Sequence, residues 1–277
     1  MKISEILDKI KAFHPPIDES HTRDTVKCGD ISQECTGVAT TCYASYDVIK
    51  RAIEKGCNLI ITHEPTFYSD DEDEDGILDG NETYLAKKKL IDDHGIVIWR
   101  DHDHIHGGGP NSDARDYIFY GIMKTLGWED YLVSSERKPL LYKVPRTTVR
   151  DLTHELMEKI GLTGARIIGD PDAPVETVFI CEHISARTFP GRKSQLAQLE
   201  ENDADAIIPL ETLDWTIAEY VLDSCAIGRT KAIISMGHFN FEEPGMKYMA
   251  EGWLPEVLDH QVPCHFVPSA DNYNYIF

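Results

Sequence analysis

Apolar and polar positions alternate along most of the chain with the periods of helices and strands. Residues 1–13 carry isoleucine and leucine at helical spacing, with acids and lysines between them. Residues 57–64, CNLIITHE, are continuously apolar up to their end, as in a strand that is covered on both faces. A strand at 36–44 and a helix at 45–56, capped by Ser45, precede it. This strand–helix–strand order predicts a parallel sheet.

The same alternation continues to the end of the chain. Further helices are expected at 82–95, 113–127, 148–161, 192–203, 212–225 and 245–260. Further strands are expected at 96–106, 140–145, 165–170, 176–183, 204–210, 230–238 and 262–268. A turn-rich segment at 127–139 separates approximate lobes of 1–130 and 131–277. The pattern therefore predicts an α/β protein with two similar lobes and mainly parallel sheets in one unit of 1–277, whose C-terminal segment can pack back on the first lobe.

Composition narrows the classes of protein. The 277 residues carry a formal net charge of −21, which repels phosphate backbones and anionic lipid, so nucleic-acid and membrane binding are disfavoured. No apolar run approaches the ~20 residues of a membrane span. The seven cysteines are odd in number and scattered, and none forms a C-x-x-C pair. They indicate reduced thiols, and we expect a cytoplasmic protein without a secretory leader.

Histidines and acids gather at three places where predicted strands end. They are His63 with Glu64, then His102, His104 and His106, and finally His238 with Glu242. Since ligands of open α/β sheets collect at the carboxyl ends of strands, the three places can converge. Taken singly, each has a simpler interpretation as a hydrogen-bonded loop histidine, a solvated strand end or a helix-start acid.

The local pattern adds two expectations. If the strand at 96–106 continues to its end, His102, His104 and His106 share one face. His238 and Glu242 come just before Pro244, which is expected to open a helix. Imidazole and carboxylate together suit zinc, iron, manganese or cobalt, and five such groups fit a pair of ions with a shared carboxylate better than one tetrahedral ion.

Three stretches in order, AIEKGCNLIITHEP, HDHIHGGGPNSDARDYI and GHFNFEEPGMKYMAEGWL, resemble the Nif-three-like family, whose members are also known as type 2 GTP cyclohydrolase I homologues. The resemblance covers essentially the whole chain, in the short form without an inserted domain. It implies two similar α/β lobes around a dinuclear metal centre, commonly in a ring-shaped hexamer.

The family's motifs are two histidines before proline, a histidine with a ligating aspartate four positions on, and His-x-x-x-Glu. Here Glu64 replaces the second histidine and His106 replaces the aspartate, so three imidazoles and two carboxylates remain. The resemblance implies the ligands His63, Glu64, His106, His238 and Glu242. We expect Glu64 and His106 on one ion, His63 and His238 on the other, and Glu242 between them. The alternative is a decayed site with one ion or none. His102 and His104 are expected around the ligands or facing substrate.

Two further features are more local. Asp71, Asp73, Asp75 and Glu82 fit the twelve-residue calcium loop D-x-D-x-D-G-x5-E, although a solvated acidic loop explains them equally simply. Arg187 and Arg192 are placed to meet a substrate phosphate, or are ordinary surface arginines.

These observations favour a metal-dependent hydrolase of the cyclohydrolase or phosphoesterase type with a small-molecule substrate such as a nucleotide. The expected assembly is a homo-oligomer, which the resemblance implies is a hexamer. One alternative is a non-enzymatic oligomeric scaffold or metal-handling protein with structural ions. Another is a mononuclear hydrolase built on His102, His104 and His106, which requires His63 and His238 to lie far from them.

Overall fold

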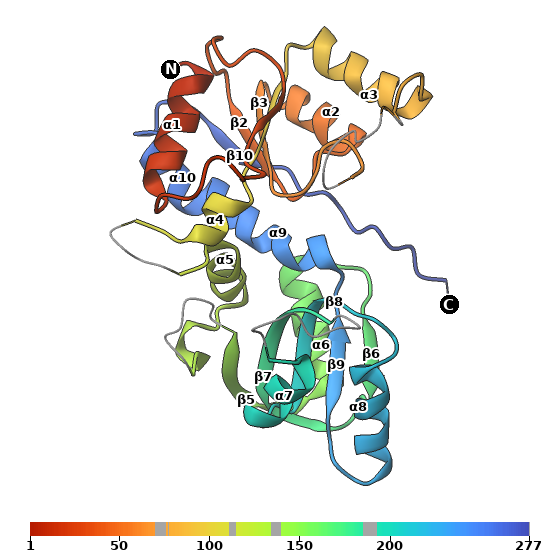
Figure 1. Ribbon diagram of the computed structural model, residues 1–277. Coiled ribbons are helices and arrows are strands. Elements are labelled where there is room, and N and C mark those ends of the chain that lie inside the picture. The colour runs from red at the N-terminus through yellow and green to blue at the C-terminus, as the bar shows by residue number, and fades with distance from the viewer. Residues whose placement is uncertain (70–75, 77, 111–114, 134–139, 185–192, 277) are drawn as a thin grey trace. The chain divides into compact units, whose positions relative to one another are not determined.

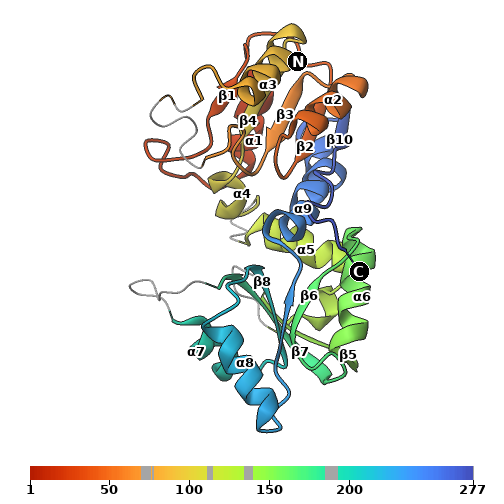
Figure 2. The ribbon, with the colours of Figure 1, turned by 90° about the vertical axis from the view of Figure 1, so that its right-hand side faces the viewer.

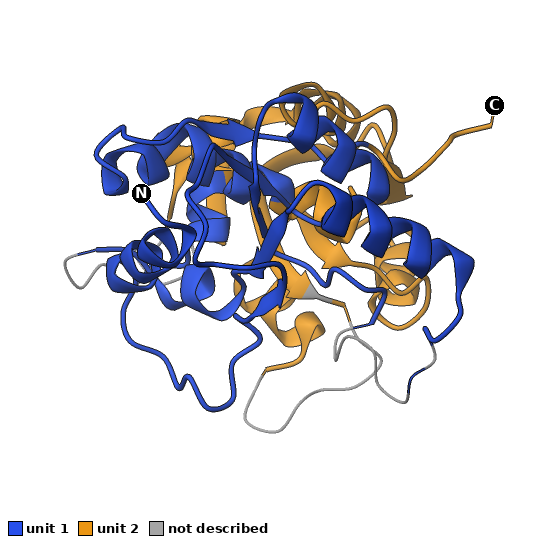
Figure 3. Cartoon of the chain, turned by 90° about the horizontal axis from the view of Figure 1, so that it is seen from above, with its two compact units in different colours: residues 1–121, 243–270 blue, residues 122–242, 271–277 orange. Residues whose placement is uncertain are grey.

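The computed structural model describes residues 1–69, 76, 78–110, 115–133, 140–184 and 193–276. The chain divides into two compact units, coloured separately in Figure 3. Unit 1 consists of residues 1–121 and 243–270, and unit 2 of residues 122–242 and 271–277. The chain passes from one unit to the other within α5 (Tyr117–Leu126), within α9 (His238–Tyr248) and again after Ala270.

A five-stranded sheet forms the centre of unit 1. Its order is β1 (Val26–Cys28), β4 (Val97–Arg100), β3 (Leu59–Thr62), β2 (Val38–Thr41) and β10 (Cys264–Phe266). All neighbours are parallel except β1, which runs antiparallel to β4. Thr62 pairs with Arg100, so β3 and β4 end at the same level. The residues that follow these two strands therefore emerge side by side at the carboxyl end of the sheet.

Helices cover both faces of this sheet (Figures 1 and 2). On one face lie α2 (Tyr46–Glu54) and α3 (Glu82–Asp93), whose apolar side chains join a core with inward residues of the strands. On the other lie α1 (Ile3–Phe13), the π-helical turn η3 (Met249–Trp253) and α10 (Leu254–Val257). The buried strands β2, β3 and β4 have no exposed residue, which explains why their sequences show no alternation of apolar and polar positions.

Unit 2 has a second five-stranded sheet. Its order is β5 (Leu141–Thr148), β7 (Pro174–His183), β8 (Ala206–Glu211), β9 (Ala232–Ser235) and β6 (Arg166–Gly169). The three central strands are parallel, and both edge strands are antiparallel to their neighbours. The helix α6 (Val149–Ile160) covers one face, and α7 (Gln195–Glu201) and α8 (Ile217–Ala226) cover the other (Figure 2). A short turn, η2 (Glu129–Tyr131), precedes β5.

The predicted α/β class, with two similar lobes and mainly parallel sheets, is confirmed. The strand expected at 96–106 is wrong beyond Arg100, because residues 103–107 form the helix α4 (Asp103–Gly107). Its start is held by Asp24, whose carboxylate accepts hydrogen bonds from the backbone N–H groups of His102, Asp103 and His104. A carboxylate on the first amides of a helix favours helix over strand at this position.

The helix expected to open at Pro244 begins earlier. α9 starts at His238 and contains Pro244 in its interior, where the missing N–H removes one intrahelical hydrogen bond. Close packing compensates for that loss. A Cβ atom on Gly245 would lie 2.7 Å from the Cα of Ile118 in α5, so the two helix backbones touch there.

Among the described residues, no helix has both the length and the apolar character needed to cross a bilayer.

Candidate metal centre

The carboxyl ends of β3 and β4 position the first of the predicted site residues. His63 and Glu64 follow β3, and both backbone N–H groups donate to the carbonyl of Cys42, at 3.0 and 2.7 Å. Asp101 follows β4, and its N–H donates to the carbonyl of Thr62 at 2.9 Å. These bonds extend the strand ladder by one residue on each side, and they fix the direction in which the His63 side chain leaves the sheet.

Three imidazoles meet at this end of the sheet. His102 and His106 lie four residues apart around the start of α4, so they project from the same side of it. The ring centroids of His63 and His102 are 4.7 Å apart and nearly parallel, and the ring of His106 stands edge-on to both, at 4.9 and 4.8 Å. One nitrogen from each ring lies within 4.8 Å of the other two. We call these residues the three-histidine centre.

The outer nitrogen of each ring is held by an oxygen. His63 Nδ1 lies 3.0 Å from the backbone carbonyl of Asp101, and His102 Nδ1 lies 2.9 Å from Asp103 Oδ1. A carbonyl only accepts, so His63 carries its proton on Nδ1 and its lone pair on Nε2. Carboxylate or carbonyl oxygens on the far nitrogen are the usual partners of metal-binding histidines.

Asp116 holds the third ring. Its Oδ2 lies 2.8 Å from His106 Nδ1, and its Oδ1 accepts from the backbone N–H groups of Ile118 and Phe119 at the start of α5. Asp116 is fully buried. One carboxylate therefore caps α5 and orients His106, which ties the position of the ring to the fold of unit 1.

The charge around His102 is also fixed. Asp103 accepts hydrogen bonds from Thr22 Oγ1 and from the Arg23 backbone N–H, both at 2.9 Å. Its hydrogen bond with His102 is the main reason why the pKa of the Asp103 carboxyl is held below its ordinary range, and the Arg23 and Thr22 hydrogen bonds act in the same direction. Asp103 is thus an anion at neutral pH, and it favours a cation on or beside the imidazole of His102.

The centre is buried on one side and open on the other. The side chain of His63 has no exposed surface, whereas those of His102 and His106 are 26% and 22% exposed. A cation held by the three rings would be anchored in the protein and remain within reach of a small molecule. Structural ions are usually closed off, and catalytic ions keep one position open.

Glu64 lies beside the centre with a fixed partner. The buried guanidinium of Arg100 donates from Nε to the His63 carbonyl at 3.0 Å, and its Nη2 lies 3.5 Å from Glu64 Oε2. Arg100 therefore holds the His63–Glu64 turn from beneath. The Arg100 guanidinium and the Glu64 carboxylate thus form an ion pair beside the three-histidine centre.

The third predicted group lies in unit 2. His238, the first residue of α9, has Nδ1 at 2.9 Å from Glu211 Oε1 at the end of β8, and Nε2 at 3.2 Å from Glu242 Oε2 one helical turn on. Glu242 is buried, whereas the side chain of Glu211 is 59% exposed. His238 thus lies between two carboxylates, and the convergence of His238 and Glu242 with the histidines of unit 1 stays a prediction.

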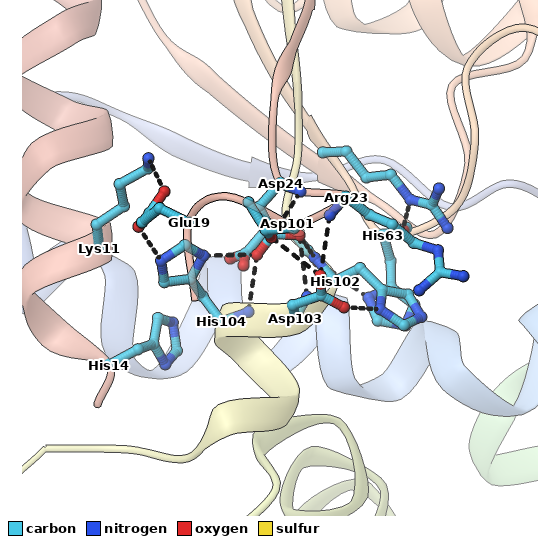
Figure 4. A network of polar contacts seen from close by, with 12 residues as sticks. Lys11, His14, Glu19, Arg23, Asp24, His63, Asp101, His102, Asp103 and His104 are labelled. Atoms are coloured by element: carbon cyan, nitrogen blue, oxygen red, sulfur yellow. Dashed lines mark hydrogen bonds and ion pairs between the residues drawn. The ribbon is translucent and has the colours of Figure 1, made fainter. Parts of the chain in front are cut away.

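The helical turn of α4 separates the histidines that an extended strand would have aligned. His104 projects away from His102, toward Asp24 and Glu19 (Figure 4). Asp101 lies beside it with no exposed surface. Burial, with a further contribution from the charge of Asp24, raises the pKa of the Asp101 carboxyl well above its ordinary value, and the nearby Ile105 backbone N–H opposes this rise.

Several predicted site residues fall outside this description. Arg187, Arg192, Asp71, Asp73 and Asp75 lie outside the described residues, so their proposed roles stay predictions. Glu82 is the first residue of α3, whose N-terminus is capped by the side chain of Asn81.

The sequence analysis did not identify Asp24, Asp101, Asp103 and Asp116, all of which contact or adjoin the site histidines. Asp116 had a usable signal, because an aspartate directly before the apolar run YIFYGIM is typical of a helix start. Asp24 had none, since nearly eighty residues separate it from the helix that it caps.

Comparisons with known proteins agree with this fold. The chain matches the model of the family described as Duf34/NIF3 (NGG1p interacting factor 3) over residues 1–272. It is 21% identical over 262 residues to a GTP cyclohydrolase 1 type 2 homolog of Clostridium acetobutylicum, covering 91% of this chain and 89% of that protein. It is 24% identical over 268 residues to the homolog of Clostridium perfringens, covering 95% and 94%.

Solved structures show the same architecture. A Bacillus cereus protein related to NIF3 superposes with a TM-score of 0.68 at 14% identity, covering 100% of this chain and 99% of that one. The Staphylococcus aureus hypothetical protein SA1388 superposes with a TM-score of 0.66 at 18% identity and the same coverage. At these identities the likeness establishes the fold.

Proposed function

Because the chain belongs to the Duf34/NIF3 family, we propose that it is a metal-dependent hydrolase whose first ion is bound by His63, His102 and His106. One observation carries the proposal: each ring has its Nδ1 at hydrogen-bond distance from an oxygen, and the three rings lie against one another. Three imidazoles with one open position are a donor set suited to zinc, iron, manganese or cobalt.

A second ion would use Glu64, His238 and Glu242, which completes a dinuclear centre. The proposal keeps the five ligands implied by the family motifs and adds His102, which the sequence analysis had placed outside the ligand set. Glu242 is the acid expected to bridge the two ions, since it is buried and contacts His238. The motif His-x-x-x-Glu places both side chains on the same face of α9.

When bound, such ions lower the pKa of water and polarise a carbonyl or phosphoryl oxygen. The protein's own groups then do the rest. The oxygens of Asp101, Asp103 and Asp116 hold the three rings in place through their Nδ1 atoms, and Arg100 pairs with Glu64 beside the centre.

The substrate class is proposed from the relatives, which are named as GTP cyclohydrolase 1 type 2 homologs. We propose a small-molecule substrate with a nucleotide base or phosphate group, in a cytoplasmic protein that assembles as a homo-oligomer, with a hexamer as the expected state. The alternative is a metal-handling or scaffold protein. The partial exposure of His102 and His106 favours the enzyme.

The test is metal analysis of purified protein, followed by turnover of GTP and model phosphoesters. We expect wild type to bind at least two equivalents of a transition metal, two of them at the dinuclear centre, and to lose activity with a chelator. His102→Ala should lose at least one equivalent and the activity. His260→Gln, a change at an exposed histidine whose ring contacts Glu256, is the matched control. Metal content unchanged in His102→Ala would refute the centre, whereas two bound ions without turnover would favour the metal-handling alternative.

A further inference from the structure

A second cluster of metal-binding groups lies on the opposite side of α4 from the three-histidine centre. It consists of Asp24, Asp101 and His104, which are 2%, 0% and 2% exposed. One ligand atom from each lies within 4.8 Å of the other two. We propose that these three residues bind a divalent transition-metal ion, such as Zn²⁺ or Mn²⁺, in a buried site separate from the proposed catalytic centre.

The Asp101 side chain is placed to bind a cation. It is fully buried, and within the described part of the chain neither of its carboxylate oxygens accepts a hydrogen bond of regular geometry. An isolated carboxylate in such a place is strongly disfavoured unless a cation or proton compensates it. Asp24 is different, because its two oxygens together accept three backbone N–H bonds and contact His104. Only Asp101 among the three residues is left without such compensation.

The His104 ring has the arrangement of a metal ligand with an outer carboxylate. Its Nε2 lies 3.0 Å from Glu19 Oε1, and Glu19 is itself held by Lys11 at 2.9 Å. If Nε2 carries the proton, the lone pair on Nδ1 faces Asp24 Oδ2 at 2.6 Å. Two lone pairs at that distance require a cation between them. A proton satisfies Asp24 and His104 alone, whereas a metal ion satisfies Asp101 as well.

Figure 4 shows how the side chains are disposed. His104 is turned toward Glu19 and Asp24, and Asp101 lies against Asp24. Bonds of about 2.0–2.2 Å to nitrogen and oxygen place two tetrahedral ligand atoms roughly 3.4 Å apart. The observed spread of up to 4.8 Å brackets that value, and the contact between His104 and Asp24 must open by less than 1 Å to admit an ion, roughly judged from the same bond lengths.

The charge balance favours a divalent ion. Glu19, Asp24 and Asp101 carry three negative charges when ionised, and Lys11 supplies one positive charge. A doubly protonated His104 still leaves the group with a net negative charge, whereas a divalent ion with neutral His104 balances it. Two carboxylates with one imidazole suit zinc or manganese better than calcium, which prefers six to eight oxygens.

The site would also stabilise its neighbour. Asp24 Oδ1 accepts from the backbone N–H of His102, and the Asp101 carbonyl accepts from His63 Nδ1. An ion that fixes both carboxylates therefore fixes the backbone from which His102 projects. This second site does not depend on the protein being a hydrolase.

The experiment compares wild type with Asp101→Asn, His104→Gln and His102→Ala. Each protein is stripped with a chelator and titrated with Zn²⁺ or Mn²⁺ against a chelating dye, and the bound metal is counted. Asp101→Asn and His104→Gln should each bind one equivalent fewer than wild type and keep the equivalent that His102→Ala loses. Glu19→Ala, which removes only the outer partner of His104, should weaken the affinity about 10–100-fold.

Asparagine has nearly the shape of aspartic acid, so Asp101→Asn also tests the rival state in which the carboxyl holds a proton. In that state the variant would bind as much metal as wild type and be at least as stable, which would overturn the proposal. A wild-type crystal soaked with Zn²⁺ gives a test that needs no variant. An anomalous peak between Asp24 and His104 is expected, and its absence at full occupancy of the three-histidine centre would also overturn the site. Loss of metal in His102→Ala alone would refute this site while leaving the proposed function intact.

Discussion

Both units place histidine at the carboxyl end of a parallel strand, but they hold it differently. In unit 1 each of the three rings has Nδ1 tied to an oxygen of a neighbouring aspartate, and the rings face one another. In unit 2 both nitrogens of His238 approach carboxylates, one of them exposed to solvent. The three rings of unit 1 are already oriented to bind a cation. His238 must give up one of its carboxylate contacts before it can become a ligand.

This contrast shows that metal affinity depends on the surroundings of a residue as well as on its type. The sequence offers histidine and glutamate in both places, and the types alone suggest equal ligands. Burial, ring orientation and the partner of the second nitrogen set their metal affinities apart. If the contrast is real, the first ion should depend on unit 1 alone, and the second should be weaker.

The largest expected effect is the loss of the first ion. His106→Ala should weaken metal binding at the three-histidine centre at least 100-fold, more than loss of an outer partner costs. Dye competition and metal counting measure this. His154→Ala, at a histidine of α6 in unit 2, is the control. Affinity within threefold of wild type would show that the three rings pack together without binding metal.

The second expected effect is a selective loss. His238→Ala and Glu242→Ala should each remove one equivalent of metal and leave the tighter equivalent in place, because the unit 1 ligands remain. Metal titration of the two variants gives the stoichiometry. A metal content equal to that of wild type would exclude His238 and Glu242 as ligands, and loss of the ion of the three-histidine centre as well would show that unit 1 does not hold that ion alone.

Acid should affect unit 1 first. Burial lowers the pKa of His14 to about 4, below its ordinary value of 6.5, so the native state keeps this ring neutral while the unfolded chain takes up a proton. The free energy of unfolding therefore has its full value above pH 6.5 and decreases as the pH falls toward 4. The loss amounts to about 3 kcal/mol of unfolding free energy. Denaturant titrations at pH 7 and pH 4.5 measure it.

His14→Gln is the matched variant, since it keeps a donor for the Gly108 carbonyl that His14 contacts and does not titrate. The variant should show a smaller decline in unfolding free energy between the two pH values. Hydrogen exchange should locate the opening in unit 1. The same decline in wild type and variant would remove His14 as the cause.

The smallest expected effect concerns an outer partner. Asp116→Asn should lower the metal affinity of the three-histidine centre about 10–100-fold, because an amide oxygen orients His106 but does not raise its basicity as a carboxylate does. Asp47→Asn, at an exposed aspartate of α2, is the control. Affinity unchanged in Asp116→Asn would mean that Asp116 serves only as the cap of α5.

Much of the fold could be predicted from the sequence, because local patterns determine it. The apolar run of β3 and the Ser45 cap of α2, whose hydroxyl accepts from Val48 N–H at 3.2 Å, are examples. The helical turn at His102–His106 could not, since a carboxylate far away in the sequence stabilises it. Neither could the start of α9, where tight packing of Gly245 on Ile118 tolerates a proline inside the helix.

The candidate site, like the fold, could be predicted from the sequence only where local patterns determine it. His63 was identified because it ends a buried strand, and the motif of His238 and Glu242 is local to one helix. The place of His102 beside His63 depends on α4 being helical, so an extended reading of HDHIH gave the wrong face. Asp24 and Asp101 act through contacts between segments far apart in the chain, for which a single sequence holds no signal. Asp103 is the neighbour of His102, and Asp116 had the signal of a helix start.

The edge strand β10 has a consequence for biosynthesis. Its three residues pair with β2, yet more than two hundred residues separate these strands along the polypeptide. A ribosome therefore releases all of 122–242 before it releases the segment that finishes the sheet of unit 1. The nascent first half must wait with an unpaired β2 edge exposed, and such edges invite association with other chains. Chaperone dependence during translation should accordingly be concentrated on the N-terminal portion.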